Sequence, residues 1–263
     1  MSVDAPPDPP APSDPLGPGR VDLHAHLLPG VDDGCRDEAE SLACVRGLIA
    51  MGYAGSVCTP HFWPAQFPRV GVEEVARRVQ RLRATLREAG LEYRLWAGGE
   101  LRLFEDADRW LAARGVPALG GAGNARRAVL VDTWRGDWPA HQDRTLDWLL
   151  DHGYTPVLAH PERSPTRHGF ARLVKRLARR GVLLQGNLRS FSGGEGERAL
   201  DLARGFLADG RYACLASDTH RPPGIFDRAA GLEAAGELAG EIGLRRLTVD
   251  APRELLGLPA AGA

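Results

Sequence analysis

Short apolar runs alternate with longer amphipathic segments along most of this chain. The apolar runs are typical of buried strands and lie at residues 21–24, 55–58, 93–97, 128–131, 155–159, 182–185 and 212–216. The segments between them favour helices at 37–50, 72–89, 105–114, 139–151, 170–180, 195–208 and 226–242, the first with Asp37 as N-cap. About seven βα units in a row predict a parallel sheet, because parallel strands need crossover connections.

Side chains that can bind a metal stand at the ends of five of these runs. The first run leads into His24 and His26, and alternate residues of a strand point to the same face, so both imidazoles can aim at one point. The others lead to His61, Glu100, His160, Asp218 and His220. An open doubly wound sheet would gather functional groups at one crevice, and no glycine-rich nucleotide fingerprint is present. Ligands at so many strand ends predict a closed barrel with its site on that face.

The expected fold class is therefore α/β: a distorted TIM-like barrel of seven βα units, forming a single domain over residues 20–263. Residues 1–19 hold seven prolines and almost no large apolar side chains. Such a segment cannot bury enough surface to offset the entropy lost on ordering, so we expect a disordered tail.

Composition narrows the possible partners and compartments. The formal charge of −1 over 263 residues offers no basic footprint for nucleic acid. No apolar stretch approaches the ~20 residues that a membrane helix needs, and the amino terminus has no signal-peptide pattern.

The four cysteines show no paired spacing, which favours reduced thiols in the cytoplasm. None is followed six positions later by arginine, which excludes a conventional cysteine phosphatase.

The donor types indicate which ions the site holds. The candidate ligands mix imidazoles and carboxylates: His24, His26, Asp33, His61, Glu100, His160, Asp218 and His220. This mixture suits manganese, iron or zinc, whereas calcium prefers oxygen alone. Eight ligands exceed what one ion needs, so we expect two or three divalent ions, with a carboxylate bridging between them.

Six motifs in order carry a family resemblance over about residues 20–256. They are VDLHAH at 21–26, LPGVDDG at 28–34, TPH at 59–61, GEL at 99–101, AHPER at 159–163 and SDTH at 217–220. The chain resembles the PHP (polymerase and histidinol phosphatase) metallohydrolases, and more closely the bacterial manganese-dependent protein-tyrosine phosphatases of the CpsB and YwqE type. Family spacing also selects Asp33, where Asp32 and Asp33 could each merely cap a turn.

The resemblance implies roles for these positions. One ion would be held by His24, His26, Glu100 and Asp218, Glu100 would bridge to a second near His160, and Asp33, His61 and His220 would complete the set. Arg163 and Arg221 match two arginines expected near the phosphate, where guanidinium forks suit phosphoryl oxygens. Manganese is the first choice of metal, with iron and zinc as alternatives, and a metal-bound hydroxide would attack phosphorus.

Three functions remain open at this stage. The first is a phosphotyrosine phosphatase whose protein substrate is the tail of a tyrosine kinase controlling capsule or exopolysaccharide synthesis. The second is a phosphatase for a small metabolite such as histidinol phosphate. The third is a non-catalytic metal-binding regulatory module.

The chain departs from the family pattern near the expected site. Phe62 and Trp63 follow the TPH motif, and Ser164 follows HPER. The loop that joins His220 to the Arg221-Pro222-Pro223 segment is shorter than the family pattern. These departures leave substrate preference open. Aromatic side chains could line a pocket for an aromatic phosphoester or merely pack at the rim of the barrel: Phe62, Trp63, Trp134 and Trp138.

Overall fold

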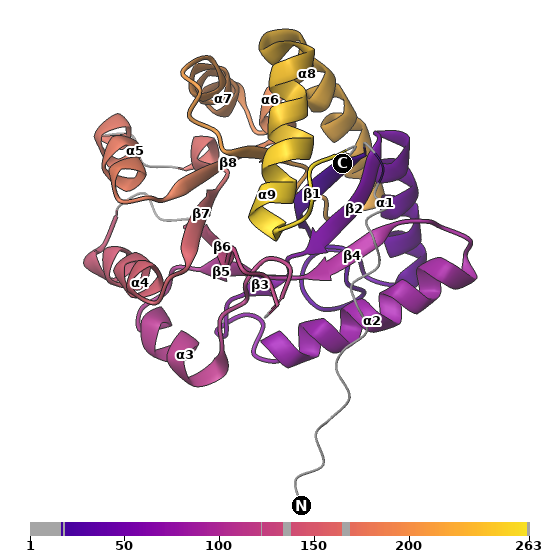
Figure 1. The fold of residues 1–263 in the computed structure, drawn as a ribbon, viewed down its shortest axis with the longest axis horizontal. Coiled ribbons are helices and arrows are strands. Elements are labelled where there is room, and N and C mark those ends of the chain that lie inside the picture. Colours follow the sequence, from indigo (N-terminus) through magenta and orange to yellow (C-terminus); the bar gives the residue numbers. More distant parts are fainter. Residues whose placement is uncertain (1–16, 18, 122, 134–137, 165–168, 262–263) are drawn as a thin grey trace, which may run out of the picture.

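The computed structural model describes residue 17 and residues 19–121, 123–133, 138–164 and 169–261. Strands lie at the centre and most helices lie outside them (Figure 1). The strands are β1 (Arg20–Ala25), β2 (Tyr53–Cys58), β3 (His61–Phe62), β4 (Arg94–Ala97), β5 (Glu100–Arg102), β6 (Ala128–Asp132), β7 (Thr155–Ala159), β8 (Leu183–Asn187) and β9 (Cys214–Ala216). The expected tail falls almost entirely on residues 1–16 and 18, outside the described residues.

The helices follow the predicted alternation closely. They are α1 (Glu38–Ala50), α2 (Val72–Glu88), α3 (Ala107–Arg114), α4 (Ala140–Asp151), α5 (Phe170–Arg179), α6 (Leu188–Phe191), α7 (Glu197–Ala208), α8 (Ile225–Arg245) and α9 (Ala251–Leu256). Asp37 caps α1 as expected, since its side chain accepts a hydrogen bond of 2.9 Å from the Glu40 amide. The short helices α6 and α9 lack a clear sequence pattern and were not predicted.

The strands form two parallel sheets, with the orders β1-β2-β4 and β3-β5-β6-β7-β8-β9. The expected closed barrel is thus shown only as an α/β fold with parallel sheets. β3 and β5 continue the paths of β2 and β4 after short breaks at 59–60 and 98–99. Pro60 has no amide proton to donate to a ladder, which explains the first break. At the second, a Cβ on Gly99 would overlap the Phe62 ring, so the close approach requires glycine.

Backbone hydrogen bonds connect the two sheets on the side of the predicted site. The amide of His26 donates to the carbonyl of Thr219 and the amide of Asp218 donates to that of His24, each at 2.8 Å. Ala25 and Thr219 form a parallel bridge. The chain segments after β1 and β9 are therefore held side by side, which brings their histidines and carboxylates together.

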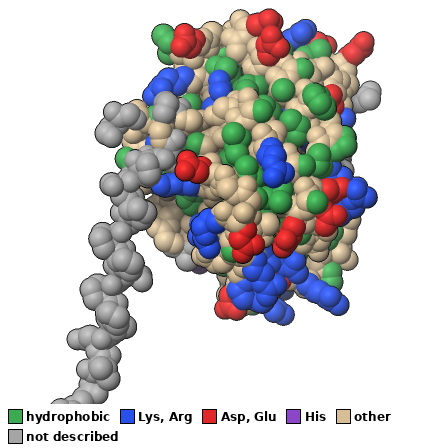
Figure 2. Space-filling model, turned by 90° about the vertical axis from the view of Figure 1, so that its right-hand side faces the viewer, with side chains coloured by type: hydrophobic (Ala, Val, Ile, Leu, Met, Phe, Trp, Pro, Cys, Tyr) green, Lys and Arg blue, Asp and Glu red, His purple; other side chains and the backbone are tan. Residues whose placement is uncertain are grey.

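The burial of the strands in the core accounts for the apolar runs in the sequence. Every residue of β6 is buried, as expected for a parallel strand covered on both faces. The helices pack amphipathic faces against the sheets, and α2 buries Val75, Val79, Leu82 and Leu86 at helical spacing. On the face seen in Figure 2, hydrophobic side chains are interspersed with acidic and basic ones. Among the described residues, no helix has both the length and the apolar character needed to cross a membrane.

Candidate metal centre

The carboxyl ends of the strands deliver most of the candidate ligands. His24 belongs to β1 and His26 follows it, while His61 begins β3 and Glu100 begins β5. His160 directly follows β7, and Asp218 and His220 come after β9. Asp33 lies in the loop between β1 and α1. The structure brings all eight predicted ligands into one region, with Asp33 the most exposed of them.

Two carboxylates lie next to the imidazoles of His24 and His26. The Nε2 atoms of His24 and His26 lie 3.1 Å apart. Glu100 Oε2 lies 3.5 Å from each, and Asp218 Oδ1 lies 3.3 and 3.6 Å from them. Glu100 Oε2 is buried and has no partner of normal hydrogen-bond geometry among the described residues. Ligand atoms of His24, His26 and Glu100 are close enough to hold one divalent ion, and so are those of His24, His160 and Asp218.

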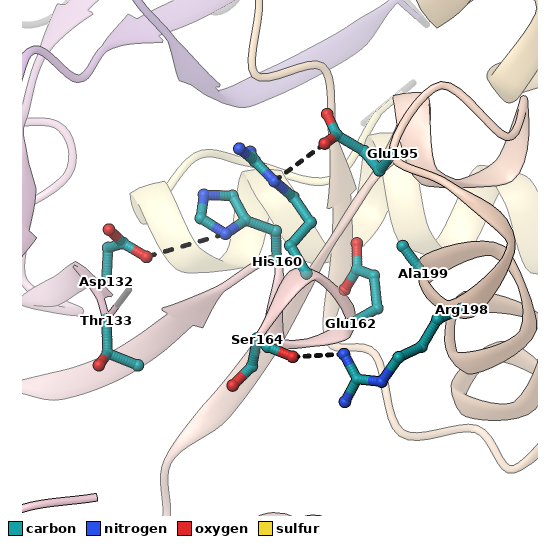
Figure 3. Close-up of a pocket in the computed structure, with 9 residues that line it drawn as sticks. Asp132, Thr133, His160, Glu162, Ser164, Glu195, Arg198 and Ala199 are labelled. Atoms are coloured by element: carbon teal, nitrogen blue, oxygen red, sulfur yellow. Dashed lines mark hydrogen bonds and ion pairs between the residues drawn. The ribbon is translucent and has the colours of Figure 1, made fainter. Parts of the chain in front are cut away.

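The other carboxylate oxygen of Glu100, Oε1, faces a second group of candidate ligands. Its Oε1 lies 3.1 Å from His160 Nε2, and the carboxylate of Asp132 lies 3.8 Å from His160 Nδ1 (Figure 3). Glu100, Asp132 and His160 are close enough to hold one ion. Asp132 was missed by the sequence analysis, although it ends strand β6 and so carries the same signal as the others. The two oxygens of Glu100 therefore face different groups of candidate ligands.

A third group lies nearer the surface. Asp33 Oδ1 is 3.3 Å from His61 Nε2 and 3.6 Å from His220 Nε2. The other ring nitrogen of His61, Nδ1, is 2.7 Å from Glu100 Oε2, which joins this group to the first. The imidazoles of His26 and His220 stack with ring centres 3.9 Å apart. The three groups therefore form one continuous set of ligands.

Outer residues fix which ring nitrogen each central histidine offers. Asp32 Oδ2 accepts from Nδ1 of His26 at 2.7 Å, and Gln185 Oε1 accepts from Nδ1 of His24 at 2.9 Å. With Nδ1 protonated in this way, each Nε2 presents its lone pair to an ion. Asp32 also accepts from the amides of His61 and Gly34, both at 3.0 Å. Asp33 therefore faces the candidate ligands His61 and His220, while the adjacent Asp32 orients His26.

Charge in the site is balanced between carboxylates and imidazoles. Burial disfavours the charged form of His24, but Glu100 and Asp218 outweigh it and raise the pKa of His24 to about 9. Burial and the neighbouring His220 lower the pKa of His26 to about 4. Burial works against ionisation of Asp218, yet His24, His220 and Arg163 hold its pKa below the usual range. The site thus retains anionic carboxylates at neutral pH and attracts cations.

Two of the four described non-glycine residues with positive φ are candidate ligands. His160 and Asp218 have φ values of 32° and 52°, in the left-handed region that residues other than glycine rarely adopt. The strained turn at Asp218 is held by its own amide bond to His24 and by Asn187 Nδ2, which donates to Asp218 Oδ2 at 3.0 Å. Such strain persists only where surrounding bonds over-determine it, and here it directs both side chains inward.

Both predicted arginines line the cavity above these ligands. Arg163 Nη1 donates to Asp218 Oδ2 at 2.7 Å, and its Nε lies 3.4 Å from Glu195. Arg163 and the exposed Arg221 border the same cavity of about 470 Å³, together with Glu100 and His160. Arg163 is therefore in reach of a group bound at the ligands, whereas Arg221 lies on the rim.

The four aromatic residues proposed to line a substrate pocket lie in different parts of the fold. Phe62 is buried in the core, and Trp138 is half-buried and packs against the core. Trp63 lines a small cavity beside the ligands. Trp134 lies outside the described residues.

Asp32→Asn is expected to lower kcat/KM roughly 10- to 100-fold, because partners that hydrogen-bond to metal-bound histidines contribute that much to metal affinity or activity. The measurement is kcat/KM together with metal content per chain. Asp201→Asn, at an exposed position on α7, is the matched control and should behave as wild type. Wild-type values for both quantities in Asp32→Asn would show that Asp32 does not orient the ligands.

Three adjoining groups of imidazoles and carboxylates at the strand ends of a parallel α/β fold form a candidate divalent-metal centre. The chain belongs to the CpsB/CapC family of capsular polysaccharide synthesis, whose model matches residues 20–256. The resemblance read from the motifs is thereby confirmed.

Curated relatives and solved structures agree with this placement. The tyrosine-protein phosphatase YwqE of Bacillus subtilis (strain 168) is 26% identical over 76% of this chain and 77% of its own length. The tyrosine-protein phosphatase CpsB of Streptococcus pneumoniae is 26% identical over 90% of this chain and 98% of its own. A crystal structure from work on YwqE and CpsB of these species, termed unique metal-dependent tyrosine phosphatases, superposes with a TM-score of 0.78 at 24% identity. The superposition covers 91% of this chain and 96% of the chain in that crystal structure.

Proposed function

We propose that this protein is a metal-dependent phosphomonoesterase that removes phosphate from tyrosine residues of proteins. The observation that carries the proposal is the geometry around Glu100, whose two oxygens face two ligand groups while Arg163 lies in the adjoining cavity. The relatives named tyrosine-protein phosphatases support the same activity.

The ligand set would hold two or three divalent ions, with manganese as our first choice and iron or zinc as alternatives. When bound, such ions make a water molecule more acidic and neutralise the oxygens of a phosphoryl group. The chain itself supplies the remaining chemistry. Arg163 is placed to bind a phosphoryl oxygen and to stabilise the charge that grows there, and Arg221 at the rim is placed to attract the anion.

The finer points of the proposal follow from the family. The protein substrate would be the tail of a tyrosine kinase that regulates capsule or exopolysaccharide synthesis, and both would meet in the cytoplasm. We also propose that the two sheets act as one distorted seven-stranded barrel, since the link between Ala25 and Thr219 joins their ends.

The deciding experiment is hydrolysis of a phosphotyrosyl peptide and of histidinol phosphate by purified protein, stripped of metal and then reloaded with manganese, iron or zinc. Metal-dependent turnover that favours the peptide would support the proposal. Preference for histidinol phosphate would replace it with a metabolite phosphatase. Bound ions without turnover of either compound would leave a metal-binding regulatory module.

Arg163→Ala is expected to lower kcat/KM on a phosphotyrosyl peptide roughly 10²- to 10³-fold, in line with the loss of one donor to transition-state charge. Metal content should stay at the wild-type level, since Arg163 contacts Asp218 without being a metal ligand. Arg204→Ala, at an exposed position on α7, is the matched control. Unchanged kcat/KM in Arg163→Ala would remove Arg163 from the site.

A further inference from the structure

A small cavity adjoins the metal centre on the side of His61. It has a volume of about 280 Å³, and its lining residues are Asp33, His61, Trp63, Gln66, Phe67, Arg102 and Asp132. We call it the Trp63 cavity. Three of its lining residues, Asp33, His61 and Asp132, belong to the candidate ligand groups. A compound held at these ligands therefore has the Trp63 cavity directly beside it.

Two aromatic side chains form the apolar part of this lining. Trp63 and Phe67 stand at the two ends of one tight turn, in which the Trp63 carbonyl accepts from the Phe67 amide at 2.8 Å and from the Gln66 amide at 3.0 Å. The Phe67 ring lies nearly parallel to the His61 imidazole, at 14° with centres 5.7 Å apart. The turn thus fixes both rings relative to a candidate ligand.

Trp63 differs from the neighbouring aromatic residue in what it contacts. Phe62 is 1% exposed and packs edge-on against Trp110 in the core. Trp63 is half-buried, and the guanidinium of Arg102 lies over its ring at 4.8 Å. Arg102 is in turn 3.5 Å from Asp132. A cation–π contact and an ion pair therefore hold the indole at the edge of the metal centre.

We propose that the Trp63 cavity receives the aromatic ring of the phosphotyrosine side chain while the phosphoryl group lies at the ligands. This inference rests on the proposed function. A benzene ring fits an apolar cavity of about 150 Å³, so the Trp63 cavity has room for a phenol ring. Aromatic rings pack favourably against one another in offset or edge-on arrangements, which an alkyl phosphoester cannot match. Trp63 thereby selects aryl over alkyl phosphoesters.

The other cavity beside His160 is less suited to a ring. It measures about 500 Å³, and the described residues that line it include Glu195, Arg198 and Ser164 but no phenyl or indole side chain (Figure 3). Its charged groups fit the polar backbone and side chains that flank a phosphotyrosine. The ring and the flanking peptide are thus assigned to different sides of the metal centre.

The test compares two inert phosphonates, benzylphosphonate and ethylphosphonate, which differ only in carrying a phenyl or a methyl group on the methylene next to phosphorus. Their affinities for the manganese-loaded protein are measured by calorimetry, which needs no turnover. Wild type should bind benzylphosphonate about two- to twelvefold more tightly, the range expected for one aromatic contact. Trp63→Ala should lose this preference with the ethylphosphonate affinity unchanged, and Trp63→Phe should keep most of it.

Trp148→Ala, which removes a half-buried indole on α4 away from the Trp63 cavity, is the matched control and should keep the preference. Equal affinities in wild type, or an undiminished preference in Trp63→Ala, would overturn the inference. Weaker binding of both phosphonates in Trp63→Ala would also overturn it, since Trp63 would then act through the metal centre. Failure of the proposed function is seen separately, as absent hydrolysis of phosphotyrosyl peptide.

Discussion

Replacing Glu100 with glutamine is expected to lower kcat/KM on a phosphotyrosyl peptide by at least ~10³-fold, because losing metal coordination removes several kcal/mol of transition-state stabilisation. Glu100 is the side chain that connects the ligand groups, with Oε2 near His24, His26 and His61 and Oε1 near His160. The amide keeps the shape but lacks the charge and replaces one donor oxygen by NH₂. Metal content per chain should fall together with activity.

The matched control is Glu92→Gln, at an exposed position before β4, which makes the same chemical change far from any ligand. It should retain wild-type activity and metal content. Circular dichroism and the unfolding temperature show whether Glu100→Gln still folds. A folded Glu100→Gln variant with near-normal kcat/KM would mean that the reaction does not use this ligand set.

The order of strands and helices was predictable because parallel strands buried on both faces are short, mostly apolar runs. β6 and β7 illustrate this, and their bounds differ from the predicted 128–131 and 155–159 by at most one residue. The division into two sheets was harder to foresee. It depends on local breaks at residues 59–60 and 98–99, where proline and glycines interrupt the ladders, and such breaks leave no mark on apolar periodicity.

The candidate ligands could be proposed because histidines at strand ends are conspicuous, and two features escaped for physical reasons. Asp132 follows the predicted strand at 128–131 and was not considered, since a single aspartate after a strand is common. Asp32 and Asp33 are adjacent and identical in chemistry, so only coordinates distinguish the side chain that orients His26 from the one that faces His61. The role of Trp63 likewise depends on Phe67 and Arg102, which come near it only in the folded chain.

Removing the metal is expected to abolish turnover and to lower the unfolding temperature. Glu100 and Asp218 are buried with pKa values below their usual ranges, so their charges persist when no ion neutralises them. An ion present at 100 times its dissociation constant stabilises the folded state by about 2.7 kcal/mol, which corresponds to ~5–11 °C for a chain above 150 residues. The measurement is calorimetry of protein treated with a chelator, before and after manganese is restored.

The pH dependence of that stabilisation separates a site effect from a general salt effect. In the metal-free protein the carboxylates raise the pKa of His24 to about 9, from an ordinary value of 6.5. A raised folded-state pKa contributes stability that is complete below pH 6.5 and is lost as pH rises through 9. Ion binding requires the neutral imidazole and grows stronger over the same interval. The temperature difference between loaded and stripped protein should therefore widen from pH 6.5 to 9. A constant difference would contradict ion binding at His24.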